Sequence, residues 1–264
     1  MVIQYFPGHM AKTIREVNEH AGQIDVIYEL RDARAPISSK NPIIEAMLVQ
    51  KPRVQIWTKA DLADGALTSR LATQEASPVL IVDLHHDPVD RLLAQATTSL
   101  LPDLAVVRAL VVGIPNVGKS TLINRLSAKA KVNVENRPGV TRHLQWITIN
   151  PQLRLLDTPG LLWKKFDDQG VALRLAALGM IPRTHVPTDE IYLFIATYCF
   201  QHYSDRVQSL YQYDGEDVYD LMRAVAKTRG LLRGTTFDED RVYDIVILDL
   251  QRGKLGKVMI DGPL

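Results

Sequence analysis

The feature that most constrains this chain is a glycine-rich segment, GIPNVGKS at residues 113–120, that is preceded by more than a hundred residues. It follows the apolar run 109–112 and comes before a helix-like run, 121–128. A strand, a glycine loop and a helix in this order predict a P-loop, in which backbone N–H groups and the helix N-terminus surround a phosphate. A glycine turn before a helix is the ordinary alternative, but the register of both glycines with Lys119 and Ser120 disfavours it.

The predicted P-loop gives its residues distinct roles. Lys119 is placed to reach the β- and γ-phosphates of a nucleotide, and the Ser120 hydroxyl is placed to bind Mg²⁺. The expected phosphate site consists of Asn116, Val117, Gly118, Lys119, Ser120 and Thr121.

Short apolar runs alternate with longer amphipathic runs as far as residue 160. The runs that favour strands are 26–30, 54–57, 79–82, 110–113, 144–149 and 153–156. The runs that favour helices between them are 43–49, 65–74, 89–100 and 121–128. This alternation predicts an α/β domain with a six-stranded, mostly parallel sheet. Only residues 150–152 join the last two strands, so we expect that pair to be antiparallel.

Helical periodicity dominates after residue 160. The runs that favour helices there are 170–178, 188–202, 205–211 and 216–228, while 241–249 fits either a strand or a helix. Pro182 and Pro187 bracket a polar connection. We therefore expect two domains, an α/β domain over residues 1–180 and a small helical domain over residues 181–264.

A second phosphate motif follows the strand at 153–156. In Asp157-Thr158-Pro159-Gly160, the Asp157 carboxylate is expected to support Mg²⁺ and the Gly160 N–H to contact a γ-phosphate. These residues also suit an ordinary turn, which would be favoured without the P-loop upstream. Thr141, in the intervening Pro-Gly-Val-Thr segment, is the expected mobile-loop ligand of Mg²⁺ and the γ-phosphate.

A base-reading motif precedes the P-loop. Thr58-Lys59-Ala60-Asp61 ends the strand at 54–57 and resembles the Asn-Lys-x-Asp element that selects guanine. The Asp61 carboxylate can accept from guanine N1–H and the 2-amino group, neither of which adenine offers, and the Lys59 stem can lie across the base. Asp83 ends the next strand, where a Ser-Ala element usually lies near guanine O6. In isolation, solvated Lys and Asp side chains would be the simpler interpretation.

Together these motifs form a GTPase set in rotated order, because the base-reading elements come before the P-loop instead of after it. A circular permutation explains this order, since it moves the termini and leaves the sheet intact. The expected ligands are GTP or GDP with Mg²⁺.

Composition limits the class of protein and its cellular environment. The net charge of +1 does not by itself indicate a nucleic-acid binder, and the single cysteine, Cys199, excludes an internal disulfide. The longest apolar run, 191–200, is about half the ~20 residues that a membrane helix needs. We therefore expect a soluble, cytoplasmic, monomeric protein with no membrane association.

Four segments closely resemble the ribosome biogenesis GTPase A family: QYFPGHMAK at 4–12, ELRDARAP at 29–36, the P-loop and following residues at 113–124, and DTPG at 157–160. The likeness covers nearly the whole chain. It implies a circularly permuted GTPase that acts in late assembly of the large ribosomal subunit, with the precursor particle and ribosomal RNA as partners. In that family the helical domain is taken to contact RNA. The basic residues that would serve here are Lys227, Arg229, Arg233, Arg252, Lys254 and Lys257.

The chain departs from the family at two positions. Thr58 replaces the Asn that would bond guanine N7, and Asp83 replaces Ser. In addition, Leu161 stands where many GTPases have a water-orienting Gln. The resemblance indicates His9 as the group that activates water and Asn116 as a ligand of a bound K⁺.

Two other functions stay open at this stage. The chain could be a nucleotide-sensing, ribosome-binding module with negligible GTP turnover, because the catalytic Gln is missing. An ATP-dependent P-loop enzyme is a third possibility, against which Asp61 argues.

Overall fold

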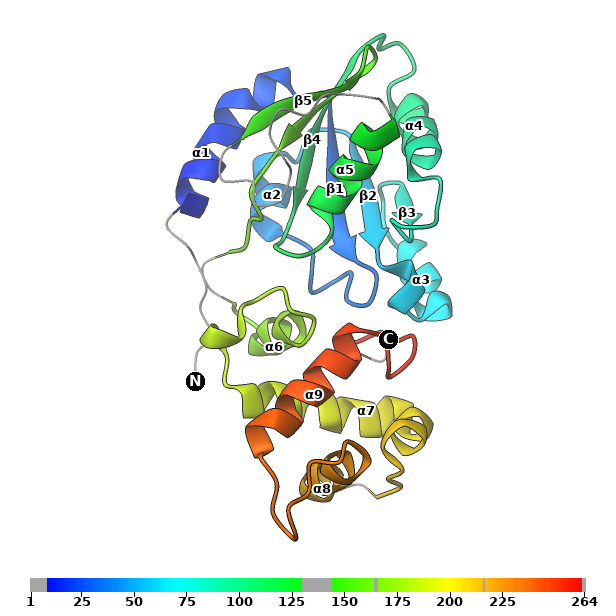
Figure 1. Ribbon diagram of the computed structural model, residues 1–264. Coiled ribbons are helices and arrows are strands. Elements are labelled where there is room, and N and C mark those ends of the chain that lie inside the picture. Colours follow the sequence, from blue (N-terminus) through cyan, green and yellow to red (C-terminus); the bar gives the residue numbers. More distant parts are fainter. Residues whose placement is uncertain (1–8, 130–143, 164–165, 216, 263–264) are drawn as a thin grey trace. The chain divides into compact units, whose positions relative to one another are not determined.

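The computed structural model describes residues 9–129, 144–163, 166–215 and 217–262, and these divide into two compact units that meet in sequence between residues 163 and 166 (Figure 1). The helix at 169–177, which we assigned to the first domain, clusters with the helices that follow it. The helical unit therefore begins at Phe166 instead of at residue 181.

The first unit is built on a six-stranded sheet. Its strands are β1 (Val26–Asp32), β2 (Arg53–Thr58), β3 (Val79–Ile81), β4 (Val107–Gly113), β5 (Gln145–Asn150) and β6 (Leu153–Asp157). Their spatial order is β3-β2-β1-β4-β6-β5, and all neighbours are parallel except β5 and β6. The predicted sheet and its antiparallel pair are thus confirmed.

Five α-helices accompany the described part of this sheet. They are α1 (His9–His20), α2 (Pro42–Met47), α3 (Gly65–Ala72), α4 (Val89–Leu100) and α5 (Lys119–Lys129), with 3₁₀ turns η1 (Ala21–Gln23) and η2 (Ala60–Leu62). Figure 1 shows α5 crossing in front of the central strands. Sequence reasoning missed α1, although Met10, Thr13 and Val17 are buried at helical spacing along one face.

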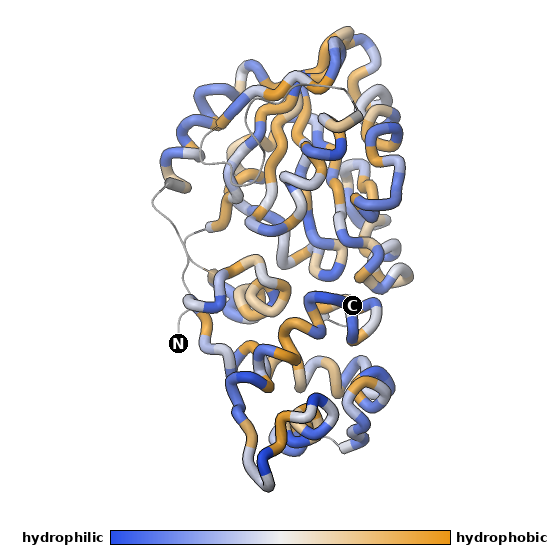
Figure 2. Tube along the Cα trace, in the orientation of Figure 1, coloured by the Kyte–Doolittle hydropathy of each residue, from blue (hydrophilic) through white to orange (hydrophobic). Residues whose placement is uncertain are grey.

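The core of the first unit follows the central strands, which Figure 2 shows as largely apolar. Every residue of β1 is buried, as are Ala109 to Gly113 of β4. The exception to the apolar pattern is that β1 also carries Glu29, Arg31 and Asp32, each 1% exposed or less. Charged side chains this deeply buried need partners of opposite charge.

The second unit contains α6 (Gln169–Ala177), η3 (Arg183–His185), α7 (Thr188–Tyr211), α8 (Val218–Thr228) and α9 (Glu239–Gln251). The two helices expected at 188–202 and 205–211 form one helix that is interrupted at Tyr203, where the backbone is non-helical (φ −143°, ψ 36°). No helix among the described residues is long and apolar enough to cross a membrane.

The ambiguous segment 241–249 lies in a helix, α9, for two local reasons. The Asp238 side chain accepts a hydrogen bond from the Arg241 N–H and caps the first turn. Val242, Val246, Ile247 and Leu250 are buried at helical spacing, which overrides the alternating pattern that had favoured a strand.

Candidate nucleotide site

Parallel pairing brings the predicted motifs to one edge of the sheet. Gly113 at the end of β4 lies opposite Leu30 of β1, and Val111 lies opposite Asp157 of β6. On the other side of β1, Asp32 lies opposite Thr58 at the end of β2. The strands β1, β2, β4 and β6 therefore end together. Ligands of open α/β sheets bind at such an edge, beyond the carboxyl ends of the strands.

The segment between β4 and α5 has the backbone of a phosphate-binding loop. Asn116 and Gly118 have positive φ angles of 60° and 106°. A Cβ at Gly118 would lie 3.1 Å from Leu84 Cδ1, and one at Gly113 would lie 2.8 Å from the Leu30 carbonyl oxygen. Both glycines are thus required, one by its conformation and its neighbours and the other by close backbone packing.

Lys119 turns its ammonium group back into this loop. Its Nζ donates to the carbonyl oxygens of Gly113 (2.8 Å) and Ile114 (3.1 Å), and the residue is only 8% exposed. Burial lowers the pKa of Lys119 to about 8, an effect that the nearby Asp157 carboxylate partly opposes. A phosphate would supply the charge that this buried ammonium needs, so the arrangement suits an anion.

The second phosphate motif lies against the P-loop. The Thr158 hydroxyl donates to the Val111 carbonyl (2.8 Å) and holds the turn after β6 on the end of β4. A Cβ on Gly160 would lie 2.9 Å from Pro115 Cα, so only glycine allows this approach. Asp157 is 2% exposed. The motif thus lies where a γ-phosphate held by the P-loop would be within reach.

Leu161, which follows this motif, offers only backbone groups to the site. Its side chain is fully buried, its N–H donates to the Gly113 carbonyl (3.2 Å), and its carbonyl accepts from Asn41 Nδ2 (2.8 Å). Asn41 is also the N-cap of α2, accepting from Ile43 and Ile44. The side chain at this position therefore cannot orient water.

Thr58 connects the base-reading loop to the P-loop. Its Oγ1 donates to the Val117 carbonyl at 2.7 Å and also lies 3.2 Å from the Arg31 carbonyl oxygen. The residue is fully buried. The shorter Thr side chain thus braces the P-loop through its backbone, although it has no amide to offer a base.

Lys59 and Asp61 take different positions after β2. Lys59 has a left-handed backbone (φ 60°) and caps η2, whereas Asp61 is exposed within η2. The Lys59 ammonium contacts Asp32 Oδ2 at 2.8 Å. Asp61 is therefore the carboxylate that remains accessible to a base, and Lys59 is held by a buried partner on β1.

The Asp83 carboxylate is directed into its own turn. It accepts from the His85 N–H (2.8 Å) and pairs with the exposed His86 ring. The loop that follows is held by Arg125 of α5, whose guanidinium donates to the carbonyls of Leu84, His85 and Asp87. These contacts keep the Asp83 charge within its turn.

The donor set at this edge suits Mg²⁺, because the Ser120 hydroxyl and the Asp157 carboxylate are oxygen ligands. The described residues contain no group of three or more His, Cys, Asp or Glu that could hold a metal by themselves. A magnesium ion would hence need nucleotide oxygens as well. Thr141 and the His9 side chain, which were predicted to contribute, lie outside the described part of the chain.

Sequence reasoning missed several residues that position the site. Asp32 and Arg34 appeared only as part of a resemblance, and Asn41 and Arg125 were not noticed. Their contacts join segments that are from 2 to 120 residues apart in sequence. The one available signal was the occurrence of charged residues inside an otherwise apolar strand at 26–32.

Comparison with known proteins agrees with this geometry. A family model described as "50S ribosome-binding GTPase" matches residues 108–222. The chain is 39% identical to ribosome biogenesis GTPase A of Bacillus cereus, over all of this chain and 95% of that protein. It is 38% identical to ribosome biogenesis GTPase A of Bacillus licheniformis, over all of this chain and 99% of that protein.

The fold is similar to solved structures. A GDP-bound structure of TM YlqF has a TM-score of 0.70 and 24% identity, covering 94% of this chain and 99% of that one. A GNP-bound YlqF from T. maritima has a TM-score of 0.68 and the same identity, over 94% and 97% of the two chains. These agree with a GTPase domain followed by a helical region. Given full-length identity of 36–39% to several named members, the chain belongs to the ribosome biogenesis GTPase A family and is a GTPase.

Proposed function

We propose that this GTPase acts in late maturation of the large ribosomal subunit and that GTP hydrolysis is coupled to its release from the particle. The observation that carries the proposal is the convergence of three motifs at one sheet edge. These are the P-loop, the turn that contains Gly160 and the base-reading loop. Membership of a ribosome biogenesis family supports the choice of partner. The site of action is then the cytoplasm, and the protein acts as a monomer.

The phosphate half of the site neutralises and holds the nucleotide. Lys119 contacts the β- and γ-phosphates, and backbone N–H groups from residue 116 to residue 121 surround them. Ser120, Asp157 and Thr141 would hold Mg²⁺, which would supply positive charge to the phosphate oxygens. The Gly160 N–H contacts the γ-phosphate, so it distinguishes GTP from GDP.

The base half selects guanine. The Asp61 carboxylate accepts from N1–H and the 2-amino group, and the Lys59 stem flanks the ring. Thr58 acts through the P-loop backbone, and the loop after Asp83 closes the base site. We expect Asp61→Ala to lose discrimination between GDP and ADP without loss of thermal stability, because Asp61 is exposed. If wild-type protein binds ADP as tightly as GDP in a competition titration, this base-reading assignment is wrong.

Water activation needs a group other than Leu161, whose side chain is buried. We assign this role to His9, because an imidazole can accept a proton or orient water near pH 7. A K⁺ ion held by Asn116 is the second candidate. His9→Ala should still bind GTP and the particle but lose most of the rate that large-subunit particles stimulate, typically ~10²–10⁴-fold for general acid–base help. Full stimulation of His9→Ala would favour K⁺, which replacing K⁺ by Na⁺ then tests.

The helical unit limits where RNA contact occurs. Residues 166–264 contain eleven Lys and Arg against fifteen Asp and Glu, whereas residues 1–165 contain twenty against fifteen. Two of the basic candidates, Arg229 and Lys254, pair with the buried Asp249 at 2.5 and 3.1 Å. Because the unit carries more acidic than basic residues, it should bind RNA phosphates only where exposed basic residues gather, such as Arg252 and Lys257.

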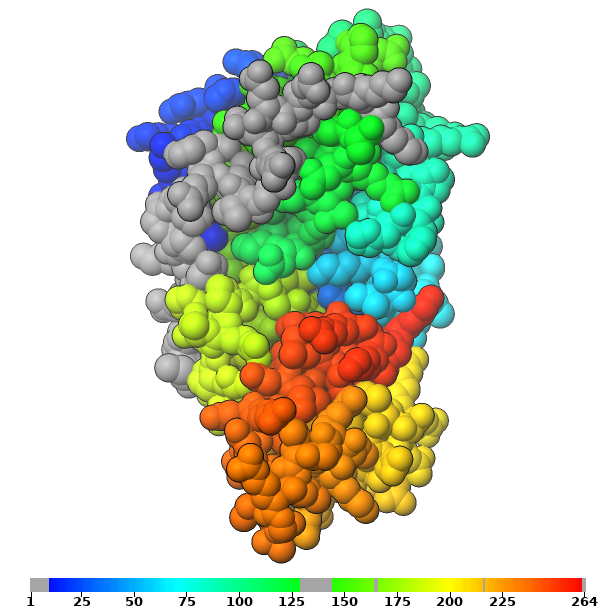
Figure 3. Space-filling view, in the orientation of Figure 1, coloured from blue at the N-terminus to red at the C-terminus, as the bar shows by residue number. Residues whose placement is uncertain are grey.

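Figure 3 shows α9 and the segment after it (red) beside α8 (orange) on the surface of this unit. Arg252 and Lys257 follow α9, and Lys227 and Arg233 lie in the last turn of α8 and just beyond it. These four exposed residues are the proposed RNA contact.

Nucleotide-dependent co-sedimentation with large-subunit precursors tests the proposal. The protein should pellet with the particles in the presence of a non-hydrolysable GTP analogue and remain in the supernatant with GDP. Arg252→Ala with Lys257→Ala should weaken pelleting and reduce its salt dependence. Equal pelleting in both nucleotide states would contradict the coupling of hydrolysis to release.

A further inference from the structure

Asp32, the last residue of β1, holds a negative charge in the interior of the first unit. The residue is fully buried, and its carboxylate accepts from the Arg34 N–H (3.0 Å), Arg34 Nε (3.0 Å) and Arg34 Nη2 (2.9 Å). A fourth contact comes from Lys59 Nζ at 2.8 Å. Burial by itself would raise the pKa of Asp32, but the charges of Arg34 and Lys59 outweigh it and hold the pKa well below its usual range.

The backbone of Lys59 is in an unfavourable conformation that contacts around the turn must hold in place. Its φ of 60° lies in the left-handed region, which residues other than glycine rarely adopt unless their surroundings impose it. Lys59 is also the N-cap residue that directly precedes η2, and η2 contains Asp61. The direction of the Lys59 side chain and the position of the Asp61 carboxylate are thus set by the same turn.

The backbone that follows β1 and β3 supports this turn from both sides of β2. The Ala33 N–H donates to the Thr58 carbonyl at 2.8 Å, and the Ala60 N–H donates to the Val82 carbonyl at 3.3 Å. These hydrogen bonds fix where the turn starts but leave the Lys59 side chain undirected. The Lys59 side chain is 26% exposed, so water would compete for its ammonium if Asp32 carried no charge.

We propose that Asp32 is a specificity-positioning residue, which binds the Lys59 ammonium and thereby holds the 59–61 turn in the orientation that reads guanine. This inference rests on the proposed base-reading role of Asp61. Asp32 does not touch the nucleotide in this scheme. It acts through Lys59, whose stem flanks the base while its ammonium stays on β1.

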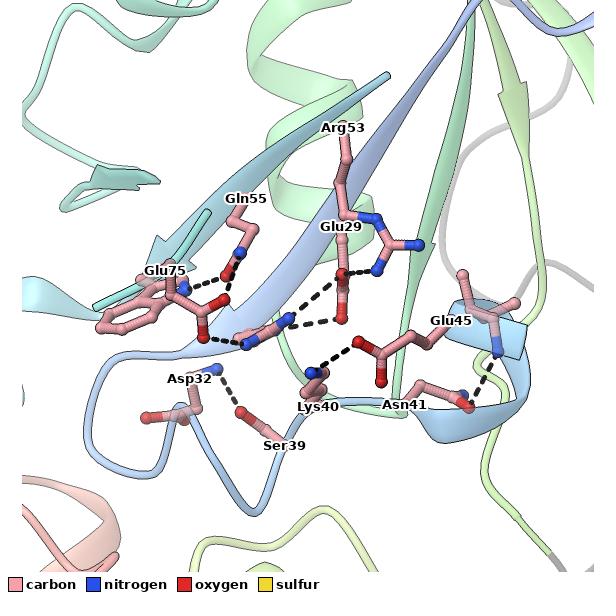
Figure 4. Close-up of polar contacts among 12 residues, drawn as sticks. Glu29, Asp32, Ser39, Lys40, Asn41, Glu45, Arg53, Gln55 and Glu75 are labelled. Atoms are coloured by element: carbon pink, nitrogen blue, oxygen red, sulfur yellow. Dashed lines mark hydrogen bonds and ion pairs between the residues drawn. The ribbon is translucent and has the colours of Figure 1, made fainter. Parts of the chain in front are cut away.

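Glu29, three residues earlier on the same strand, provides a matched control. It is 1% exposed, and its carboxylate pairs with Arg31 (3.0 Å) and Arg53 (2.7 Å). Arg31 in turn donates to Glu75, which also accepts from Gln55. Figure 4 shows Glu29, Arg53, Gln55 and Glu75 of this network. None of the contacts described for the Glu29 carboxylate reaches the 59–61 turn. Glu29→Gln therefore removes an equally buried charge from the same strand without touching Lys59.

The experiment measures GDP and ADP affinities of wild-type, Asp32→Asn, Lys59→Met and Glu29→Gln proteins by competition titration, together with thermal unfolding. Asp32→Asn should lose about 10-fold or more in the GDP-to-ADP affinity ratio, while its ADP affinity stays near that of wild type. Lys59→Met keeps the apolar stem and removes only the ammonium, at a position that is partly exposed. Its GDP-to-ADP affinity ratio should fall as far as that of Asp32→Asn, and this result stands even if Asp32→Asn folds poorly. Glu29→Gln should unfold at a lower temperature with an unchanged ratio.

The double variant Asp32→Asn/Lys59→Met completes the test. Because the two residues are proposed to act as a unit, its ratio should be no lower than that of either single variant. If Asp32 had only a structural role, Asp32→Asn would lower the GDP and ADP affinities together, as Glu29→Gln would. A parallel loss of both affinities in Asp32→Asn therefore overturns the proposal. A changed GDP-to-ADP ratio in Glu29→Gln, or an unchanged ratio in Lys59→Met, also overturns it.

Asp61→Ala separates this inference from the function on which it rests. If Asp61→Ala loses discrimination while Asp32→Asn and Lys59→Met keep it, only the role of Asp32 is wrong. If Asp61→Ala itself discriminates as wild type does, the base-reading assignment is wrong and the role of Asp32 falls with it.

Discussion

The proposed nucleotide site has two halves, one for phosphate and one for the base, and they are held in different ways. The phosphate half takes its shape from backbone conformation, with positive φ at Asn116 and Gly118 and the Lys119 ammonium on backbone carbonyls. The base half is held by side-chain contacts, from the Thr58 hydroxyl to the Val117 carbonyl and from the Lys59 ammonium to the Asp32 carboxylate on β1. In the base half, substitutions at Thr58 and Asp32 should therefore act on the ligand through neighbouring groups, whereas those at Lys119 in the phosphate half should act on it directly.

The largest effect is expected at Lys119 in the phosphate half. Lys119→Ala should lower GTP hydrolysis by at least ~10²–10³-fold, because it removes a preorganised charge at the transferring phosphate. Thermal unfolding without nucleotide should not worsen, since the buried ammonium is itself poorly solvated. Single-turnover hydrolysis and nucleotide-free melting measure the two outcomes, and near-normal hydrolysis would refute the P-loop assignment.

Gly118 tests whether backbone conformation carries the phosphate half. Gly118→Ala places a Cβ at φ 106° and 3.1 Å from Leu84 Cδ1, which should cost about 1–3 kcal/mol of unfolding free energy and weaken GDP binding. Gly65→Ala is the control, because a Cβ there meets nothing within 4 Å and Gly65 opens a helix. Chemical denaturation compares the two, and equal stability of both variants would mean that the loop tolerates other conformations.

Thr58 tests the connection between the halves. Thr58→Val keeps the shape of the side chain but removes the donor to the Val117 carbonyl. It should lower the free energy of unfolding by about 1 kcal/mol and the GDP affinity by about fivefold. Thr58→Ser retains the hydroxyl and should bind GDP nearly as wild type does. GDP titration of both variants decides the question: equal affinities would show that the hydroxyl does not brace the P-loop.

The smallest expected effect is a pH dependence in the base half. The pKa of Asp32 lies below its ordinary value of 3.8, so its charged contacts stabilise the fold above that pH and lose this contribution as pH falls further. The difference in melting temperature between wild type and Asp32→Asn should thus be widest near neutrality and narrow in acid. A difference that stays constant down to about pH 3 would show that the charge of Asp32 is not what matters.

The sequence predicted the strand, the glycine loop and the helix of the proposed phosphate half because their conformation is encoded locally. Two glycines, a lysine and a serine at fixed spacing specify a turn and a helix start, and the Gly160 motif does the same after β6. The strand directions of the sheet could be predicted for a similar reason. Alternating strand and helix runs favour parallel neighbours, and a three-residue connection requires an antiparallel pair. The missed helix α1 does carry apolar residues at helical spacing, Met10, Ile14 and Val17, so its sequence held a signal that was overlooked.

By itself, the sequence determined the permuted order of motifs and the six strands, and it indicated the residues proposed to bind phosphate, because each depends on neighbours within a few positions of the chain. Tertiary structure alone decided that Thr58 braces the P-loop, that Asn41 holds Leu161 and that Arg125 holds the loop after Asp83. These contacts join residues from 41 to 120 positions apart. Pairings across such distances arise only when the sheet brings its strand ends together, which no local pattern in the chain encodes.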